Sequence, residues 1–300
     1  MAGQLVVVTG PTASGKTTWA IQLAQHLDTE VISFDSRQLY REMTIGTAKP
    51  TAAELAKVPH HGVNSHPITE PQSAASFTAY LLPIVTDLLN RKGVAVAVGG
   101  SGLYLKALLG GFDSIPAKDP QLRAKLEQQW QQEGLAPLLQ QLQALDPVYF
   151  AAVDQHNPHR VIRALEVCLV SGRPFSDQRT GEGQSRDFTA LQIGVAWPRE
   201  ALYERINTRV DQMLAHGLLQ EAQRLHPQRG LSSLETVGYT ELFDYLEGRH
   251  DWEEAVRLIK RNTRRYAKRQ LTWFRKQPVT WFAPDDYARA EAWIDQQLAP

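Results

Sequence analysis

The chain has 300 residues, of which 43% are hydrophobic, and its 32 Lys and Arg residues balance 32 Asp and Glu residues. This length allows a large buried core, organised as one main domain with an insertion or a second domain, and the neutral charge by itself gives no sign of a nucleic-acid partner. The single cysteine excludes an internal disulfide, and no apolar run approaches the length of a membrane span, so we expect a soluble, cytoplasmic protein with no membrane partner.

The first predicted elements enclose a phosphate-binding loop. Leu5–Val8 is typical of a buried strand, and the apolar spacing from Trp19 onward predicts a helix. Between them stand Gly10, Pro11, Thr12, Ala13, Ser14, Gly15, Lys16 and Thr17. In such a loop the glycines let backbone N–H groups turn toward phosphate oxygens, the Lys reaches the outer phosphate, and the Thr hydroxyl typically binds Mg²⁺. The protein therefore handles a di- or triphosphate, which the loop alone does not identify.

A second strand is predicted over residues 30–34 and ends at Asp35. Because the carboxyl ends of parallel strands form the ligand crevice, Asp35 and the following Ser36, Arg37 and Gln38 are expected beside the bound phosphates. The carboxylate is suited to bind Mg²⁺ or to act as a general base, and it is equally suited to cap a helix. Position alone does not decide between these roles.

The third predicted strand, residues 94–98, is closed by Gly99-Gly100-Ser101 instead of the Asp that many ATPases and GTPases carry at such a place. This lowers the expectation of ordinary ATP hydrolysis. The two glycines permit close approach of the backbone to a ligand. Helices are predicted around this strand at 75–90 and 103–109. The preceding connection carries His60, His61 and His66, for which we expect a nucleic-acid or polar surface role because no Cys or carboxylate accompanies them at metal-ligand spacing.

From residue 118 to 188 strand patterns vanish and helical periods dominate, which predicts an all-helical insertion domain. It includes a helix over 160–170, where Cys168 is expected to be packed, and a flexible return at 181–185. A strand over 190–197 then rejoins the sheet; helices follow at 198–216, 218–225, 235–246 and 251–276, then a strand at 279–282 and a helix at 286–298. The predicted fold is α/β, a phosphate-loop core over 1–117 and 189–300 with a parallel sheet flanked by helices.

The predicted helix 251–276 has a strongly basic stretch. Between Val256 and Lys276 there are nine Lys and Arg residues and no acidic residue. Arg257, Arg261, Arg264, Lys268 and Arg275 fall near helical spacing, which is typical of a surface that binds a polyanion. The alternative is a solvated face of a helix that packs through its apolar side. Arg205 and Arg209, four residues apart, either clamp a phosphate group or lie on the surface.

Several ordered motifs resemble those of the tRNA dimethylallyltransferases. They are Gly10–Thr17, Asp35-Ser36-Arg37-Gln38-Leu39-Tyr40, Ile45-Gly46-Thr47-Ala48-Lys49-Pro50, Pro59-His60-His61, Gly99–Tyr104, Asn157-Pro158-His159-Arg160 with Arg163-Ala164-Leu165-Glu166, Gly238-Tyr239, and Lys268–Arg275. The resemblance covers nearly the whole chain. It departs from the family pattern at Ser101, where many relatives have Thr, and at Thr240, where relatives usually have Lys or Arg.

The resemblance implies that the loop holds the diphosphate of dimethylallyl diphosphate, with Lys16, Thr17 and the cofactor Mg²⁺ neutralising it and Arg209 as a further contact. Asp35 would accept a proton from the adenosine amine that attacks the allylic carbon, and Ser101 would orient the amine or Asp35. The partner implied is the tRNA anticodon stem-loop, with no protein partner. The residues implied for tRNA contact are Asp35, Ser36, Arg37, Gln38, Ser101, Arg123, His159, Arg160, Val161, Ile162, Arg163, Arg264, Lys268 and Arg269.

Two other classes of function are open to this sequence. A phosphate-loop small-molecule kinase would use the helical insertion as an ATP lid, with Arg123 and Arg163 as lid arginines, but it gives the basic helix no purpose. A non-catalytic RNA-binding module leaves the intact loop and Asp35 unexplained. Consumption of ATP, or prenylation without it, distinguishes these readings.

Overall fold

The computed structural model describes residues 3–111, 113, 115–116, 119–179 and 183–299. These residues form two compact units, Met1–Leu109 with Arg186–Pro300, and Gly110–Ser185. The boundaries expected from the sequence, 117/118 and 188/189, lie somewhat later in the chain than the boundaries of these units at 109/110 and 185/186. The return segment expected at 181–185 falls partly outside the described residues, as do both residues of the 117/118 boundary.

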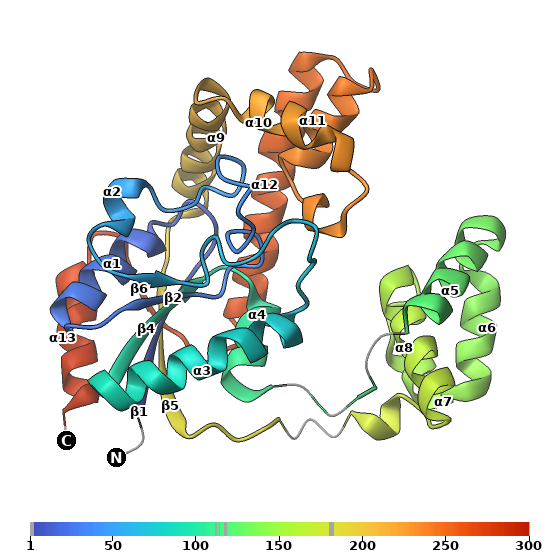
Figure 1. Cartoon of the computed structure of the whole chain (residues 1–300), viewed down its shortest axis with the longest axis horizontal. Helices are drawn as coiled ribbons and strands as arrows, with labels where there is room; N and C mark the ends of the chain where they lie inside the picture. Colours follow the sequence, from blue (N-terminus) through green and yellow to red (C-terminus); the bar gives the residue numbers. More distant parts are fainter. Residues whose placement is uncertain (1–2, 112, 114, 117–118, 180–182, 300) are drawn as a thin grey trace. The chain divides into compact units, whose positions relative to one another are not determined.

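The larger unit is built on a parallel sheet with the strand order β3-β2-β4-β1-β5-β6, which confirms the predicted α/β class (Figure 1). The strands are β1 (Gly3–Thr9), β2 (Val31–Ser33), β3 (His60–His61), β4 (Val94–Gly99), β5 (Phe188–Val195) and β6 (Thr280–Phe282). β1 lies between β4 and β5, so Val7 is paired with Ala97 on one side and with Gln192 on the other. The phosphate-binding loop therefore follows a central strand.

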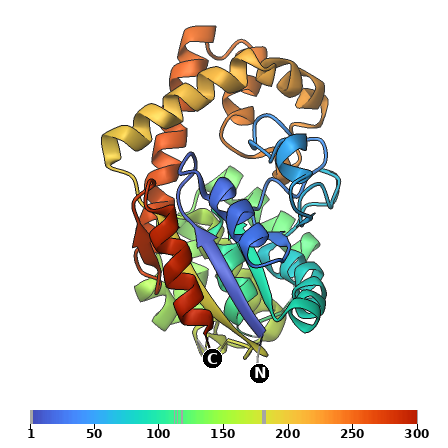
Figure 2. The ribbon, with the colours of Figure 1, turned by 90° about the vertical axis from the view of Figure 1, so that its left-hand side faces the viewer.

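Each strand sends alternate apolar side chains to opposite faces of the sheet. Val6 and Val8 pack against α1 (Lys16–His26) and α13 (Tyr287–Leu298), which lie on the same face in Figure 2. Leu5 and Val7 pack on the other face. That face is covered by α3 (Ala74–Lys92), α4 (Gly102–Gly110) and the end of α12 (Trp252–Phe274). The continuous apolar runs in the sequence reflect burial on both faces.

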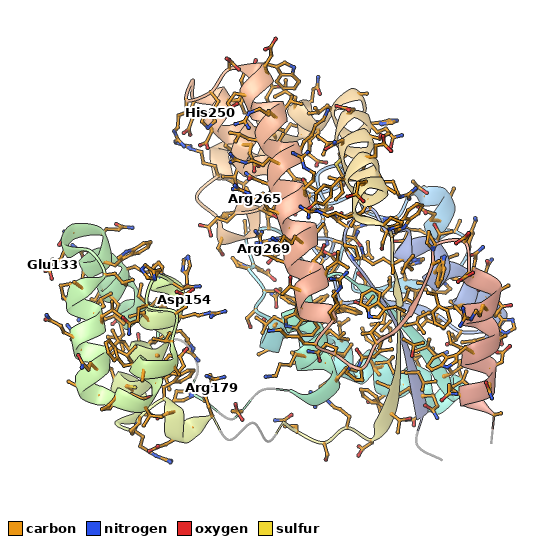
Figure 3. All side chains as sticks on the ribbon, turned by 180° about the vertical axis from the view of Figure 1, so that it is seen from behind. Glu133, Asp154, Arg179, His250, Arg265 and Arg269 are labelled. Carbon is orange, nitrogen blue, oxygen red and sulfur yellow. The ribbon has the colours of Figure 1, made fainter. Side chains whose placement is uncertain are left out.

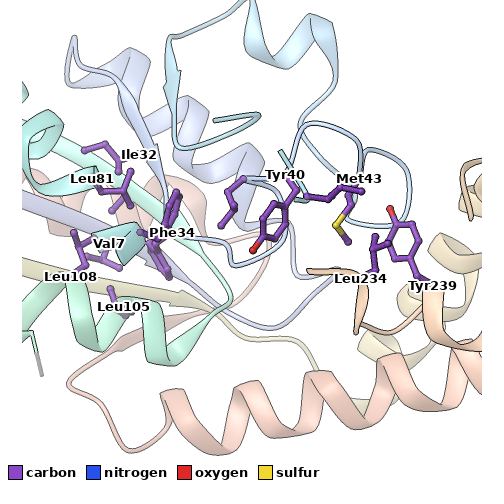
Figure 4. Close-up of a cluster of buried hydrophobic side chains, with 14 of the residues drawn as sticks. Val7, Ile32, Phe34, Tyr40, Met43, Leu81, Leu105, Leu108, Leu234 and Tyr239 are labelled. Carbon is purple, nitrogen blue, oxygen red and sulfur yellow. The ribbon is translucent and has the colours of Figure 1, made fainter. Parts of the chain in front are cut away.

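The remaining helices of this unit extend the second core beyond the sheet. They are α2 (Ala52–Leu55), α9 (Arg199–Ala215), α10 (Leu218–Leu225) and α11 (Tyr239–Leu246), with short 3₁₀ turns at His226–Gln228 and Ser232–Leu234. Figure 4 shows this core running from Val7 and Phe34 near the sheet to Met43, Leu234 and Tyr239. The long connection after β2 is thus packed against the C-terminal helices.

The smaller unit contains α5 (Pro120–Glu133), α6 (Ala136–Leu145), α7 (Pro147–Ala152), α8 (Pro158–Ser171) and a 3₁₀ turn at Ser176–Gln178, and its described residues include no strand. Asp119, Asp146 and Asn157 each cap a helix whose first residue is Pro. Cys168 is buried in the core of this unit, and burial raises the pKa of its thiol. A thiol in such surroundings is a packed side chain.

No helix in the described ranges combines the length and the apolar character needed to cross a membrane.

Candidate active site

The loop between β1 and α1 has the backbone geometry of an anion-binding turn. Gly10 has φ +148° and Gly15 has φ +92°, conformations that favour glycine. Ala13, between them, also has a positive φ of 64°. The loop ends at the N-terminus of α1, where unpaired N–H groups and the helix dipole favour negative charge. The backbone therefore supplies the donors that the sequence motif predicts.

Side chains from the C-terminal half hold this loop from outside. Trp197 Nε1 donates to Ser14 O at 2.8 Å, and Arg205 Nε donates to Ala13 O at 2.9 Å. The Arg205 guanidinium also lies over the Trp197 ring, 4.2 Å from its centroid. Arg205 is thus an exposed residue whose guanidinium bonds the loop backbone.

Arg209, one turn further along α9, reaches the interior side of the loop. Its guanidinium lies 3.5 Å from Thr12 Oγ1 and 3.4 Å from Ala48 O, both long contacts for hydrogen bonds. Burial lowers the pKa of Arg209, and the charge of Asp35 opposes that shift. The two arginines, equivalent in sequence spacing, therefore differ: Arg205 supports the loop, and Arg209 is a half-buried cation available to an anion.

Lys16 is a second half-buried cation at the same place. Its Nζ donates to Pro11 O at 3.3 Å. Burial lowers the pKa of Lys16 to about 8, while Asp35 raises it and Arg209 lowers it further. Desolvated like charges beside one another favour an anionic ligand, because the ligand replaces the lost hydration. This electrostatic arrangement supports the prediction that the loop receives a phosphate group.

Asp35 follows β2 and lines the same cavity. Its Oδ1 accepts from the backbone N–H of Arg37 at 2.9 Å and of Gln38 at 3.3 Å. Within the described residues, Oδ2 accepts no hydrogen bond of this kind. One carboxylate oxygen therefore caps the turn and the other is available to a ligand, so the two sequence-based readings are compatible.

Ser101 lies beside this turn and is buried. Its hydroxyl accepts from Ser36 N and donates to Ser36 Oγ, both at 3.0 Å. It is absent from the described residues that line the cavity. Ser101 is therefore placed to fix the backbone next to Asp35 rather than to contact a ligand from the cavity wall.

The expectation that Gly99 and Gly100 admit a ligand is corrected by the structure. A Cβ at Gly99 would clash with the Phe34 ring, and a Cβ at Gly100 would clash with the Gln270 amide. Gly102 is packed in the same way against Trp273. The glycines are required because side chains of the protein itself, two of them from α12, approach the end of β4.

The cavity at this site has a volume of about 860 Å³ and is lined by residues of the larger unit. It joins the phosphate-binding loop and Asp35 to the segment 46–51 and to α9 and α12. Glu221 fixes the start of that segment, because its buried carboxylate accepts from the N–H groups of Thr44, Ile45 and Gly46 and from the Tyr239 hydroxyl. Val210, Met213, Leu218, Val237 and Ile259 give part of the wall an apolar character.

Two cavity residues on α12, Tyr266 and Gln270, were not among the predicted site residues, although Gln270 lies within the motif Lys268–Arg275. Burial raises the pKa of the Tyr266 phenol to about 12, and the charge of Asp35 acts in the same direction. Gln270 is buried and bonds both Thr12 N and Gly100 O. A signal was present: Ile259, Tyr266, Gln270 and Phe274 follow helical spacing opposite the most exposed cations.

Arg37 and Gln38, expected to contact tRNA, direct their side chains to the protein itself. The Arg37 guanidinium donates to the carbonyls of Ser232, Ser233 and Glu235. Gln38 Nε2 donates to the carbonyls of Thr47 and Ala48. These bonds tie the turn after β2 to neighbouring loops, and contact of the two residues with tRNA stays a prediction.

The cationic face predicted for α12 is partly paired within the protein. Arg264 is half-buried and donates to Asn207 of α9 at 2.6 Å, and the exposed Arg257 is paired with Glu254. Lys260 is paired with Asp211. Lys268 and Arg275 of that face are exposed, as are Arg265 and Arg269, and Figure 3 shows Arg265 and Arg269 on the same side of the helix. Lys268 and Arg269 remain candidates for contact with a polyanion, whereas Arg264 supports the packing of α9.

In the smaller unit, most of the predicted RNA contacts are structural. Glu166 is fully buried; its carboxylate accepts from Arg163 at 2.9 Å and lies 3.5 Å from Arg123. Val161 and Ile162 are fully buried in the core, so their side chains are not available to RNA. His159 and Arg160 are exposed at the first turn of α8. Arg123 and Arg163 are partly exposed, so contact with RNA stays a prediction for these two residues as well as for His159 and Arg160.

The loop histidines are also engaged within the protein. His60 and His61 form β3, and His61 Nε2 lies 2.6 Å from Glu30. His60 Nδ1 bonds Val58 O at 2.8 Å, and His66 lies against the Phe77 and Tyr80 rings. His60 and His61 therefore form an edge strand of the sheet, which the sequence did not predict.

The fold and the site together define the class of the protein. The sheet is parallel, and the loop after its central strand contains two glycines with positive φ. Two half-buried cations lie at that loop. These features define a phosphate-loop α/β protein.

Comparison with known proteins identifies the family. Residues 38–277 match the model of the IPP transferase family. The chain is 46% identical to the tRNA dimethylallyltransferase of Christiangramia forsetii, over 91% of this chain and 90% of the relative, and 46% identical to that of Cytophaga hutchinsonii, over 90% and 88%. The chain therefore belongs to the IPP transferase family, and it is a prenyl-transferring enzyme.

Solved structures of relatives agree with this assignment. The full-length tRNA isopentenylpyrophosphate transferase of Bacillus halodurans superimposes with a TM-score of 0.73 at 40% identity, covering 99% of this chain and 97% of that one. A eukaryotic dimethylallyltransferase described as acting on tRNA superimposes with a TM-score of 0.78 at 25% identity, covering 98% of this chain and 77% of that one. The whole described architecture, and not the loop alone, is therefore that of the family.

Proposed function

We propose that the protein transfers a dimethylallyl group from dimethylallyl diphosphate to the exocyclic amine of the adenosine 3′ of the anticodon in tRNA, with release of diphosphate. The observation that carries the proposal is that the phosphate-binding loop and Asp35 line one cavity. The names of the curated relatives supply the donor group and the tRNA acceptor.

The diphosphate of the donor binds the loop between β1 and α1. It is surrounded by the N–H groups of the loop, the Lys16 ammonium and the Arg209 guanidinium. Its negative charge compensates the positive charge of these two partly desolvated side chains. As the allylic C–O bond breaks, its electron pair leaves with the diphosphate. Cations held in place before the reaction stabilise that developing charge without reorganisation.

The amine of the adenosine attacks the allylic carbon from the side opposite the diphosphate. Its nitrogen forms the new C–N bond and loses a proton to Asp35 Oδ2, the oxygen that no described N–H group engages. Ser101 is a positioning residue here, because it fixes Ser36 next to Asp35. The adenosine must leave its stack to reach this cavity, at a cost of a few kcal/mol.

The residues at the loop suit a Mg²⁺ cofactor that travels with the diphosphate. Thr17 lines the cavity, and Ser14 Oγ is buried without a hydrogen-bond partner among the described residues. Mg²⁺ is commonly bound by one or two protein oxygens together with substrate phosphates and water. Thr17 would hold it through its hydroxyl; when bound, the ion spreads the charge of the diphosphate.

Contact with tRNA is proposed for side chains exposed on each unit, described separately. On the larger unit these are Lys268 and Arg269 of α12, and on the smaller unit His159 and Arg160 of α8. Basic side chains neutralise backbone phosphates, and a ring such as that of His159 is suited to stack on a splayed base of the anticodon loop.

The experiment that tests the function omits ATP. Purified protein, Mg²⁺, dimethylallyl diphosphate and unmodified tRNA are expected to give tRNA heavier by one dimethylallyl group, with one diphosphate released per group transferred. The mass of an anticodon fragment checks the position. Modification that requires ATP, or that occurs only on a small acceptor, would reverse the assignment in favour of a kinase.

A further inference from the structure

Gln270 on α12 connects two segments of the active site that are distant in sequence. Its Oε1 accepts from the backbone N–H of Thr12, in the phosphate-binding loop, at 2.8 Å. Its Nε2 donates to the carbonyl of Gly100, directly after β4, at 2.9 Å. The side chain is 6% exposed, so water does not readily replace either bond.

The two bonds require a side-chain amide. Among side chains of this size, an amide both donates and accepts, an ionised carboxylate only accepts, and a thioether makes neither bond at comparable strength. Gly100 shows the same requirement from the other side, because a Cβ there would clash with the Gln270 amide nitrogen. The pair Gly100 and Gln270 is thus matched in both shape and hydrogen bonding.

The position of Thr12 gives these bonds a consequence for the donor. Trp197 and Arg205 hold the loop at Ser14 and Ala13, and Gln270 holds it at Thr12. The Thr12 hydroxyl in turn lies 3.5 Å from Arg209. Loss of the amide releases the part of the loop that faces the half-buried guanidinium.

We propose that Gln270 is a positioning residue for the diphosphate of the donor, which it serves by fixing Thr12 between the end of β4 and Arg209. The identity of the donor rests on the proposed function; the bonds themselves do not. Removal of the amide therefore raises the KM for dimethylallyl diphosphate and leaves the KM for tRNA within about twofold.

The test uses inorganic pyrophosphate with Mg²⁺ as the probe, measured by calorimetry on the full-length protein. Gln270→Glu keeps the shape but loses the donor, and Gln270→Met keeps the approximate volume but loses both bonds. Each is expected to bind pyrophosphate about tenfold more weakly than the parent protein. Thr272→Ala, an exposed change on the same helix, is the matched control and is expected to stay within about twofold.

A double-mutant cycle distinguishes the specific interaction of Gln270 with Gly100 from a general loss of order in the phosphate-binding loop. Gly100→Ala displaces the amide while Gln270 is still present, so this variant should also weaken pyrophosphate binding. The double variant that combines Gly100→Ala with Gln270→Met should bind pyrophosphate no more weakly than Gln270→Met alone. Thermal unfolding of every variant is recorded, and Gly100→Ala provides the test if the Gln270 variants do not fold.

Equal pyrophosphate affinity in the parent protein and in the shape-conserving variants would overturn the inference, and so would fully additive losses in the cycle. Neither result bears on prenylation. Conversely, failure of tRNA prenylation by a parent protein that binds pyrophosphate would overturn the proposed function and leave the role of Gln270 to be judged from binding.

Discussion

The two oxygens of Asp35 have different surroundings, and this difference determines which substitution is informative. Oδ1 caps the turn through the N–H groups of Arg37 and Gln38, so Asp35→Ala would disturb both the turn and any proton transfer. Asp35→Asn retains an acceptor for the turn and removes the basic oxygen. The two substitutions therefore separate a structural role from a catalytic one.

We expect Asp35→Asn to lower kcat by about a hundredfold or more, the range for loss of a general base, with little change in tRNA affinity. Steady-state assays at saturating donor and tRNA measure the first quantity, and filter binding of tRNA measures the second. A variant that transfers the dimethylallyl group at the parent rate would show that Asp35 acts only as a cap.

Lys16 makes diphosphate binding sensitive to pH. Burial lowers its pKa to about 8 in the free protein, so the ammonium is charged below that pH and increasingly neutral above it. A bound diphosphate favours the charged form. Above pH 8, binding must therefore be accompanied by uptake of a proton, and affinity falls as pH rises.

The expected result is about one proton taken up per pyrophosphate near pH 9, after correction for the ligand's own titration. Calorimetry in buffers of different ionisation enthalpy measures the uptake. Lys16→Gln is the control and should lose that component. Equal proton uptake in the parent and the Lys16→Gln protein would assign it to another group.

At the scale of elements, strands and helices were predictable where one physical pattern dominates. Residues 94–98 are five small or β-branched apolar residues in sequence, and they form β4. β3 was missed because His60 and His61 carry no apolar pattern and are defined by pairing with Val31 and Ile32. A short edge strand depends on its neighbour in space, which local sequence does not reveal.

The same reasoning explains why part of the cationic face of α12 is paired within the protein. Helical spacing shows which cations share a side, but the partner helix decides which side is covered. Asn207 and Asp211 of α9 engage Arg264 and Lys260, and no pattern within α12 predicts them. The pairing of Arg163 with the buried Glu166 was not predicted for a similar reason. The sequence does not show which carboxylate a basic residue pairs with, so a basic residue near a motif is interpreted as a ligand contact.

These contacts give a prediction for α12. Replacing Lys268 and Arg269 by Gln should weaken tRNA binding and reduce the dependence of log affinity on log salt by roughly 0.7 for each lost contact. Arg264→Gln should leave the slope nearly unchanged and lower the thermal stability instead, because its guanidinium bonds Asn207. Binding titrations at several salt concentrations distinguish the two; an equal slope change in both variants would place Arg264 at the RNA surface.

At the scale of the whole molecule, the donor and the acceptor are assigned to different sets of residues. The cavity is lined by residues of the larger unit, so the smaller unit contributes none of the described groups around the diphosphate. His159 and Arg160 belong to the smaller unit and are exposed on it. Substitutions of residues that line the cavity and of the exposed residues on α8 should therefore affect different ligands.

We expect the paired change His159→Ala and Arg160→Ala to weaken binding of an anticodon stem-loop by about tenfold, the range for losing one stacking and one phosphate contact, with no change in pyrophosphate affinity. Arg209→Ala should give the opposite pattern, because its half-buried guanidinium faces the phosphate-binding loop. Titration of each variant with each ligand separately measures all four affinities. If the changes on α8 weakened pyrophosphate binding as well, the smaller unit would have to act on the diphosphate site, and the division of roles between the units would fail.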